Sequence, residues 1–260
     1  MTQWQRADRP RRRIGRGVEA HATIGSTNDR ARELLDEPHA EGRAIVAEEQ
    51  TAGRGRRGRT WLSPTGRNLM LSVAVRPRIA AGDVWQLGAA AALGVRAGCA
   101  AFAALALKWP NDLVSLDGAK VAGLLIETTI EGDRISAAII GVGINVNWPR
   151  LEMPSGIAVG ATSLGEIAGV AIDRADLLAD VLDGLDAELV AIEAGLSPLP
   201  RYREACVTLG TTVGVETATG RIEGVAVEVD DVGALVIETT AGRVSLTSGE
   251  VVRLRAAALT

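Results

Sequence analysis

The stretch Thr51–Trp61 reads TAGRGRRGRTW and places four arginines among three glycines ahead of a tryptophan. The chain as a whole has a formal net charge of −4, so this concentration of positive charge is local. Glycine lets a loop refold and approach a ligand closely, and arginine offers a planar fork of donors that fits a carboxylate or a phosphate. One interpretation is therefore a mobile loop that closes over a small anion.

Three other interpretations of this loop are open. A P-loop with arginine in place of lysine must open a helix, but Pro64 and Gly66 follow here. Nucleic-acid-binding arginine–glycine segments are usually long and repeated, whereas this is one loop between two predicted strands. The third alternative is a solvated basic loop without a ligand. The choice depends on whether other ligand-binding motifs accompany the loop.

The composition is that of a globular protein. Of the 260 residues, 47% are apolar and 23% are charged, which allows one large domain with a small one beside it. The mildly acidic balance argues against a dedicated binder of nucleic acid or anionic membranes. The sequence has no 18-residue apolar run and no apolar segment behind its basic N-terminus. We therefore expect no membrane span, no secretory signal and a cytoplasmic location.

Cysteines and histidines are few. Cys99 and Cys206 lie far apart and fit reduced thiols better than a disulfide framework. The two histidines, His21 and His39, offer little material for a zinc site or a Ser-His-Asp triad. No dedicated metal site is therefore predicted.

The first 17 residues are strongly basic. They contain one acidic residue, Asp8, and six arginines: Arg6, Arg9, Arg11, Arg12, Arg13 and Arg16. Basic runs at a chain terminus are commonly solvated. We therefore expect residues 1–17 to form a disordered basic arm.

Residues 18–208 alternate between strand-like and helix-like segments and are expected to form the main domain. Helices are expected at Asn28–Leu35, with Ser26 or Thr27 as the N-cap, at Val84–Ala104 and at Arg174–Ala194. The strands expected in this domain are Ala44–Glu49, Leu69–Val75, Val121–Thr129 and Ile135–Val142.

The sequence pattern changes between Cys206 and Thr211, where we place the domain boundary. Short strands separated by turns predict a small β-barrel domain over residues 209–260. Its strands are expected at Val213–Thr217, Ile222–Val229, Leu235–Thr239, Val244–Leu246 and Val251–Leu254.

Three further motifs each have an ordinary structural explanation when taken alone. Lys108–Asp112 reads KWPND, and Asn-Asp after a proline is typical of a turn. Lys120 begins a predicted strand, where a lysine is more often solvated than functional. Gly141–Asn145 reads GVGIN and lacks the third glycine of a dinucleotide-binding fingerprint.

In combination and order, these motifs resemble those of the biotin–protein ligase family, the biotin–[acetyl-CoA-carboxylase] ligases. The resemblance covers about residues 20–255. Its five elements are Ser26–Asn28 (STN), Glu48–Trp61 (E-x-Q-T-x-G-R-G-R-x-G-R-x-W), Lys108–Asp112 (KWPND), Gly118–Glu127 (G-x-K-x-x-G-x-L-x-E) and Gly141–Asn145 (G-x-G-x-N).

The resemblance implies an α+β fold. A mixed β-sheet catalytic domain flanked by helices, like that of class II synthetases, would occupy residues 18–208. A small SH3-like β-barrel would follow over residues 209–260. Some family members carry an N-terminal helix-turn-helix that represses transcription, but only about 20 residues precede the catalytic region here. The short form without that domain is therefore expected, and DNA binding is not.

Members of the family join biotin to ATP, giving biotinyl-5′-AMP and pyrophosphate, and then transfer biotin to a lysine of a biotin carboxyl carrier domain. The first step brings a carboxylate against a phosphate, and two unit charges about 4 Å apart repel by about 4 kcal/mol at an effective dielectric of 20. Cations around the reacting oxygens offset that repulsion. The resemblance assigns this catalytic role to Lys120, Arg54 and Arg56, with Lys120 stabilising charge rather than forming a covalent bond.

The resemblance also implies a set of binding residues. Biotin contacts are expected from Ser26, Thr27, Asn28, Gln50, Gly53, Arg54, Gly55, Arg56, Trp61, Lys120, Gly123 and Leu125. Nucleotide contacts are expected from Arg54, Arg56, Trp61, Asn111, Lys120 and Asn145, with Lys108 and Asp112 supporting them. Mg²⁺ is expected with ATP, held mainly by phosphates and water. The partner would be the carrier domain of a biotin-dependent carboxylase, and the enzyme a monomer or weak homodimer.

Two alternative functions are open. A lipoate–protein ligase-like enzyme would share the fold and the acyl-adenylate chemistry, but the arginine–glycine stretch with KWPND favours biotin. A nucleic-acid-binding regulator would use the basic arm and the loop.

Overall fold

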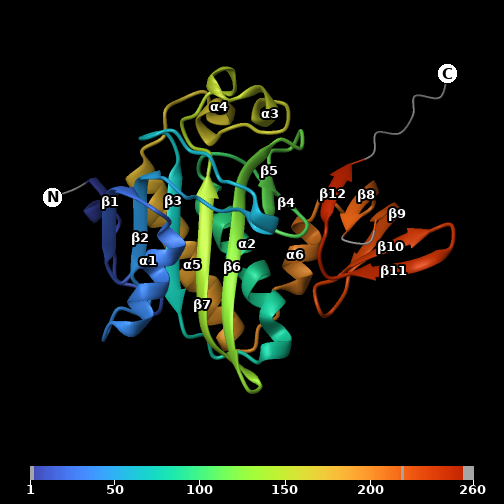
Figure 1. Ribbon diagram of the computed structural model, residues 1–260, viewed down its shortest axis with the longest axis horizontal. Helices are drawn as coiled ribbons and strands as arrows, with labels where there is room; N and C mark the ends of the chain where they lie inside the picture. Colours follow the sequence, from blue (N-terminus) through green and yellow to red (C-terminus); the bar gives the residue numbers. More distant parts are fainter. Residues whose placement is uncertain (1–2, 218–219, 254–260) are drawn as a thin grey trace.

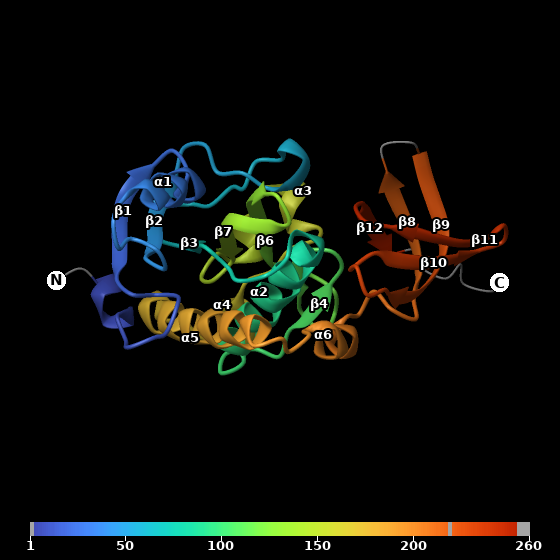
Figure 2. The same cartoon turned by 90° about the horizontal axis from the view of Figure 1, so that it is seen from below.

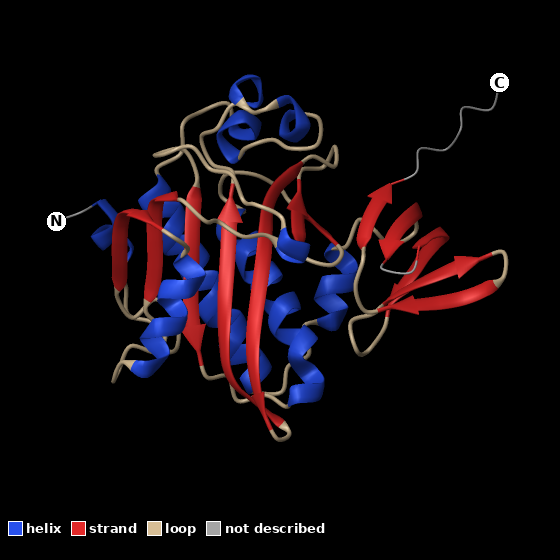
Figure 3. Cartoon of the chain, in the orientation of Figure 1, coloured by secondary structure: helices blue, strands red, loops and turns tan. Residues whose placement is uncertain are grey.

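The computed structural model of the protein describes residues 3–217 and 220–253. A seven-stranded sheet flanked by helices forms the larger part, and a separate five-stranded sheet forms the smaller part (Figures 1 and 3). The expected α+β class is therefore observed.

The larger sheet is mixed, with the strand order β1-β2-β3-β7-β6-β5-β4. β1 and β2 pair in parallel and the other neighbours are antiparallel. Its strands are β1 (Val18–Ile24), β2 (Ala44–Gln50), β3 (Leu69–Val75), β4 (Ala106–Lys108), β5 (Asp112–Val114), β6 (Lys120–Glu131) and β7 (Arg134–Ile144).

Helices cover both faces of this sheet: α2 and α5 pack on one face and α1 on the other (Figures 1 and 2). The α-helices are α1 (Thr27–Glu33), α2 (Val84–Cys99), α3 (Ser155–Ala158), α4 (Leu164–Ala168), α5 (Arg174–Glu193) and α6 (Leu199–Ala205). Short 3₁₀ helices are η1 (Gln3–Ala7), η2 (Leu34–Asp36), η3 (Arg56–Gly58), η4 (Ala81–Asp83) and η5 (Arg150–Glu152).

Two glycines of α2 allow this helix to approach α5 closely. A Cβ on Gly94 would lie 2.8 Å from the Gly184 backbone, and one on Gly98 would lie 2.5 Å from Val181 Cα. Glycine lowers helix propensity by roughly 1 kcal/mol relative to alanine, so here packing outweighs propensity. The predicted α2 ran to Ala104, but the helix ends at Cys99, because the chain turns back into β4 and Arg96 Nε donates to the Leu105 carbonyl at 2.7 Å.

The smaller sheet is antiparallel, with the order β11-β10-β9-β8-β12, and corresponds to the expected SH3-like module. Trp109 of the KWPND loop ties it to the main domain: its Nε1 donates to the Gly233 carbonyl and its backbone N–H to Thr208 Oγ1, each at 3.0 Å. The strands are β8 (Thr212–Thr217), β9 (Gly220–Val229), β10 (Leu235–Thr239), β11 (Gly242–Leu246) and β12 (Glu250–Arg253).

The basic arm is ordered over residues 3–17, so the expectation of disorder is wrong for this part. Trp4, Ala7 and Ile14 are buried in the main core. The Trp4 indole donates to Glu48 Oε1 at 3.2 Å and lies 5.0 Å beneath the Arg174 guanidinium.

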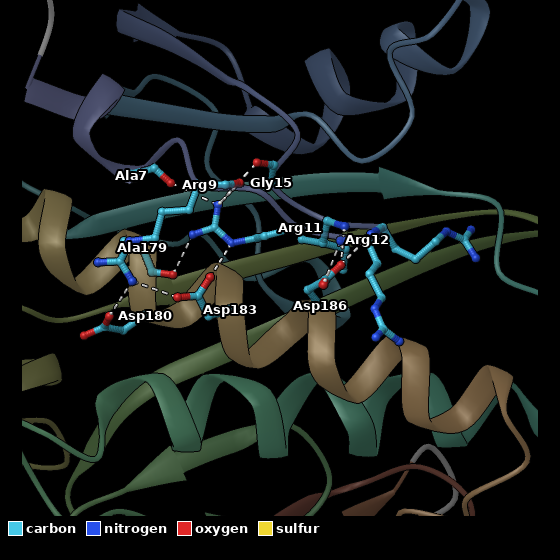
Figure 4. A network of polar contacts seen from close by, with 11 residues as sticks. Ala7, Arg9, Arg11, Arg12, Gly15, Ala179, Asp180, Asp183 and Asp186 are labelled. Atoms are coloured by element: carbon cyan, nitrogen blue, oxygen red, sulfur yellow. Dashed lines mark hydrogen bonds and ion pairs between the residues drawn. The ribbon is translucent and has the colours of Figure 1, made fainter.

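Electrostatic complementarity explains why the arm packs on α5 (Figure 4). The acidic residues of α5 and its N-cap recur at helical spacing and share one face: Asp173, Asp176, Asp180, Asp183 and Asp186. Arg6, Arg9 and Arg11 form ion pairs with this face. Asp186 accepts the backbone N–H groups of residues 12, 13 and 14 at 2.6–3.0 Å.

Among residues 3–217 and 220–253, no helix is both long and apolar enough to span a bilayer.

Candidate active site

A cavity of about 180 Å³ lies between the larger sheet and residues 53–61, called here the arginine loop. Its walls come from the start of α1, the arginine loop, the KWPND loop, the strands β6 and β7, and residues 249–251 at the start of β12. A second cavity of about 320 Å³ adjoins it, shares Arg56 and Asn111, and extends between α2, α6 and the smaller sheet.

Most of the predicted site residues line the first cavity: Ser26, Thr27, Asn28, Gln50, Arg54, Gly55, Arg56, Trp61, Lys108, Asn111, Asp112, Lys120, Gly123 and Leu125. Gly53 and Asn145 do not belong to its lining. Gly53 begins the loop and faces its other end, where a Cβ would come within 2.7 Å of the Trp61 carbonyl oxygen. Asn145 is buried, and its Nδ2 donates to the Thr162 carbonyl at 3.1 Å, so it supports the backbone instead.

One end of the cavity is polar and uncharged. Ser26 occupies the N-cap position of α1, but its side chain makes no capping hydrogen bond and faces the cavity with those of Thr27 and Asn28. Gln50 Oε1 accepts the Thr27 backbone N–H at 2.8 Å and the Thr27 hydroxyl at 3.0 Å. Ser72 Oγ lies 2.6 Å from Asn28 Oδ1 and 2.7 Å from Thr27 Oγ1. These bonds hold several donors and acceptors in fixed directions.

Glycines of β6 and β7 leave room for two of the side chains that line the cavity, Trp61 and Asn28. Gly123 of β6 pairs with Gly143 of β7, and the Trp61 ring lies over both. A Cβ on Gly143 would come within 2.4 Å of Trp61, and one on Gly141 within 2.3 Å of Asn28 Oδ1. The Nε1–H of Trp61 is buried and has no hydrogen-bond partner among the described residues, so a buried donor is present beside the cavity.

The other end of the cavity is cationic. Lys120 Nζ lies 2.7 Å from Asp112 Oδ1 and 5.6 Å from the centroid of the Trp61 ring. Arg56 Nη1 donates to Asn111 Oδ1 at 3.0 Å, and Asn111 Nδ2 donates to the Leu124 carbonyl at 2.9 Å. Burial lowers the pKa of the Arg56 guanidinium, which nevertheless stays protonated at neutral pH.

The other three arginines of the loop bind residues of the elements on either side of it. Arg54 donates to both carboxylate oxygens of Asp29 on α1, each at 2.7 Å. On the other flank, Arg57 Nη1 donates to the Glu216 carbonyl at 3.1 Å and Arg59 forms an ion pair with Glu250. The loop is therefore attached to α1 on one side and to the smaller sheet on the other.

Several lining or supporting residues escaped the sequence analysis. Ser72 had one available signal, since it is a polar residue within a fully buried apolar strand. Gly141 and Gly143 belonged to a recognised motif, but their contacts depend on where Trp61 folds. The contributions of Gly249, Glu250 and Val251 had no local signal, because they come from a separate sheet.

Comparison with known proteins agrees with this architecture. Residues 21–145 match the biotin/lipoate A/B protein ligase family, and residues 208–254 match the biotin protein ligase C-terminal domain. A bifunctional ligase/repressor BirA from Bacillus subtilis is 34% identical over 92% of this chain and 74% of the relative. The chain belongs to the biotin protein ligase family. It is a ligase, as the resemblance of its motifs had implied.

Two further biotin ligases are similar over nearly their whole length. The biotin–[acetyl-CoA-carboxylase] ligase of Paracoccus denitrificans is 36% identical over 88% of this chain and 98% of that protein. The structure of the Aquifex aeolicus biotin protein ligase in complex with biotin and ATP aligns with a TM-score of 0.78 at 31% identity, covering 92% of this chain and 99% of that chain. The predicted family and fold class are thereby confirmed.

Proposed function

We propose that the protein joins biotin to ATP, forming biotinyl-5′-AMP and pyrophosphate, and then transfers the biotinyl group to a lysine of a biotin carboxyl carrier domain. The observation that supports this reaction is the division of one cavity into an uncharged polar end and a cationic end. Biotin has the same division, because an uncharged ureido ring and a carboxylate lie at its two ends.

The polar end fits the ureido ring. The ring offers one carbonyl acceptor and two N–H donors. Hydroxyl and amide side chains can donate to the carbonyl and accept from the N–H groups. Ser26, Thr27 and Asn28 are all less than 5% exposed, so bonds made there would be shielded from water. The Trp61 ring, which packs directly on Gly123 and Gly143, offers an apolar wall against which the fused rings and the valeryl chain can pack.

The cationic end fits the adenylation step. A carboxylate oxygen of biotin attacks the α-phosphorus of ATP, the bond from that phosphorus to the β-phosphate oxygen breaks, and pyrophosphate leaves. Lys120 and Arg56 would offset the repulsion between the two anions, most strongly in the transition state. Asn111 would orient Arg56, and Asp112 would hold Lys120 in place. Closure of the loop would shield the mixed anhydride from water.

In the second step the carrier lysine attacks the acyl carbon and AMP leaves. The lysine must first lose a proton, because its ordinary pKa is about 10.4. Mg²⁺ would enter with ATP, held mainly by phosphate oxygens and water. This fits the described lining, in which Asp112 and Glu250 are the carboxylates and each is already paired with a cation.

Exchange of labelled pyrophosphate into ATP tests the first step without the carrier. The wild-type protein should show exchange that requires biotin, and Lys120→Ala should lower it at least 100-fold while leaving the circular dichroism spectrum unchanged. Exchange with lipoate but not with biotin would keep the chemistry and replace the substrate. Exchange with neither acid would refute the proposal.

A further inference from the structure

Arg54 differs from Arg56 in what its guanidinium contacts. Both terminal nitrogens of Arg54 are engaged by the two oxygens of Asp29, in a bidentate pair at 2.7 Å. Arg56 instead donates to a neutral amide, Asn111. This pair uses two of the five N–H donors of Arg54 and compensates its charge within the fold, in a geometry that fixes the guanidinium against α1.

The Arg54–Asp29 pair joins the two structural elements that build the biotin end of the cavity. Asp29 follows Asn28 in α1, and Arg54 follows Gly53 at the base of the arginine loop. The base of the loop is closed by a hydrogen bond of 3.0 Å from the backbone N–H of Trp61 to the Gly53 carbonyl. An antiparallel β-bridge between Arg54 and Thr60 closes it further. The position of Arg54 therefore bears directly on the position of Trp61.

The same pair is connected to Asn28 through a short network. Arg32 contacts Asp29 at 2.9 Å and Glu127 at 3.1 Å, and Glu127 Oε2 accepts from Asn28 Nδ2 at 2.6 Å. A hydrogen bond from Arg54 is the main cause that lowers the pKa of Asp29. The same hydrogen bond is the main cause that raises the pKa of Arg54. Both groups are therefore ionised at neutral pH.

We propose that Arg54 and Asp29 are positioning residues, a clamp that holds the base of the arginine loop against α1 and so sets Trp61 and Arg56 over the cavity. This rests on the proposed function. It replaces the direct contact with biotin and nucleotide that the resemblance implied for Arg54. Asp29, outside the recognised motifs, becomes part of the machinery because it is the acceptor of the clamp.

A double-mutant cycle with Arg54→Gln, Asp29→Asn and the double variant tests the clamp, because removing either partner breaks the same contact. We expect each of the three to lower kcat/KM for biotin in pyrophosphate exchange by about fivefold, since both side chains are partly exposed. Asp29→Asn also removes the contact with Arg32, so the deciding result is non-additivity: the double variant should fall no more than about twofold below the weaker single variant. Glu33→Gln removes a carboxylate from the same helix and should stay within twofold of wild type.

Tryptic cleavage after Arg57 and Arg59 in the substrate-free protein supplies a readout that needs no activity. The clamp predicts faster cleavage in all three variants, by a similar factor. The proposal would be overturned if Arg54→Gln lowered kcat/KM for biotin more than 50-fold while Asp29→Asn stayed near wild type. Arg54 would then be a ligand contact. If wild type lacks biotin-dependent exchange, the proposed function fails, whereas the cleavage rates still decide whether the clamp exists.

Discussion

The N-terminal arm and the arginine loop are the two arginine-rich segments of the chain, and Arg56 of the loop is held in a different way from the arginines of the arm. In the arm, Arg9 and Arg11 meet carboxylates on α5. In the loop, Arg56 is held inside a cavity by the neutral amide of Asn111. A hydrogen bond to Asp183 raises the pKa of Arg9, whereas burial lowers that of Arg56.

This difference teaches what separates a structural arginine from one available to a ligand. A guanidinium matched by a carboxylate has its charge compensated within the fold. Arg56 has lost part of its hydration, and the carboxylate that attracts it, Asp112, is already paired with Lys120, so an arriving anion supplies a partner of its own. The cation is pre-organised for a ligand at some cost to the stability of the free protein.

The largest expected effect is on catalysis at Arg56. Arg56→Ala should lower biotin-dependent pyrophosphate exchange by about 10²–10³-fold, the usual range for removing a donor that stabilises developing charge. Its free energy of unfolding should not fall, because a desolvated charge is removed. Exchange assays and urea unfolding of the same preparation check both. Exchange within threefold of wild type would erase the distinction between the two segments.

The arm should show the reverse behaviour, in stability rather than activity. Arg11 is only 2% exposed in its side chain and donates to Asp183 and to backbone carbonyls, so Arg11→Ala should cost about 2–3 kcal/mol of unfolding free energy. Arg9 binds the same Asp183 but is 45% exposed, so Arg9→Ala should cost at most about 1 kcal/mol. Equal costs, measured by urea unfolding, would show that burial does not set the strength of this interface.

Substrates should change the loop but not the arm. With biotin and ATP together, trypsin should cleave after Arg57 and Arg59 about tenfold more slowly than in the free protein, because the closed loop is less often accessible. Cleavage within the arm should be unaffected. Mass spectrometry of the early fragments separates the sites, and equal protection of both would point to global stabilisation instead.

The smallest expected effect is the acid sensitivity of the arm interface. A hydrogen bond from Arg6 is the main cause that lowers the pKa of Asp173. A carboxyl with a depressed folded pKa stabilises the protein above its unfolded pKa of about 3.9 and loses that contribution as the pH falls through the folded value. The stability gap between wild type and Asp173→Asn should therefore be constant above about pH 5 and shrink below about pH 4. A gap independent of pH down to pH 3 would contradict the assignment.

Much of the fold and site followed from local patterns in the sequence. Helical spacing marked α5, buried apolar runs marked β3, β6 and β7, and the motif order identified the ligase family. The arm was misjudged because a run of arginines looks the same whether it is solvated or paired. Its partner was nevertheless visible, as the acidic residues at helical spacing from Asp173 to Asp186.

The sequence by itself determined which side chains have the chemistry to match an uncharged polar ring and an anion, because the chemistry of a motif is local. The tertiary structure alone decided which arginine meets which partner: Asp29 for Arg54, Asn111 for Arg56 and Glu250 for Arg59. It also brought Ser72 under α1 and Gly143 under Trp61. The reason is physical: the role of a charge depends on its burial and its partners, and both are properties of distant segments brought together by packing.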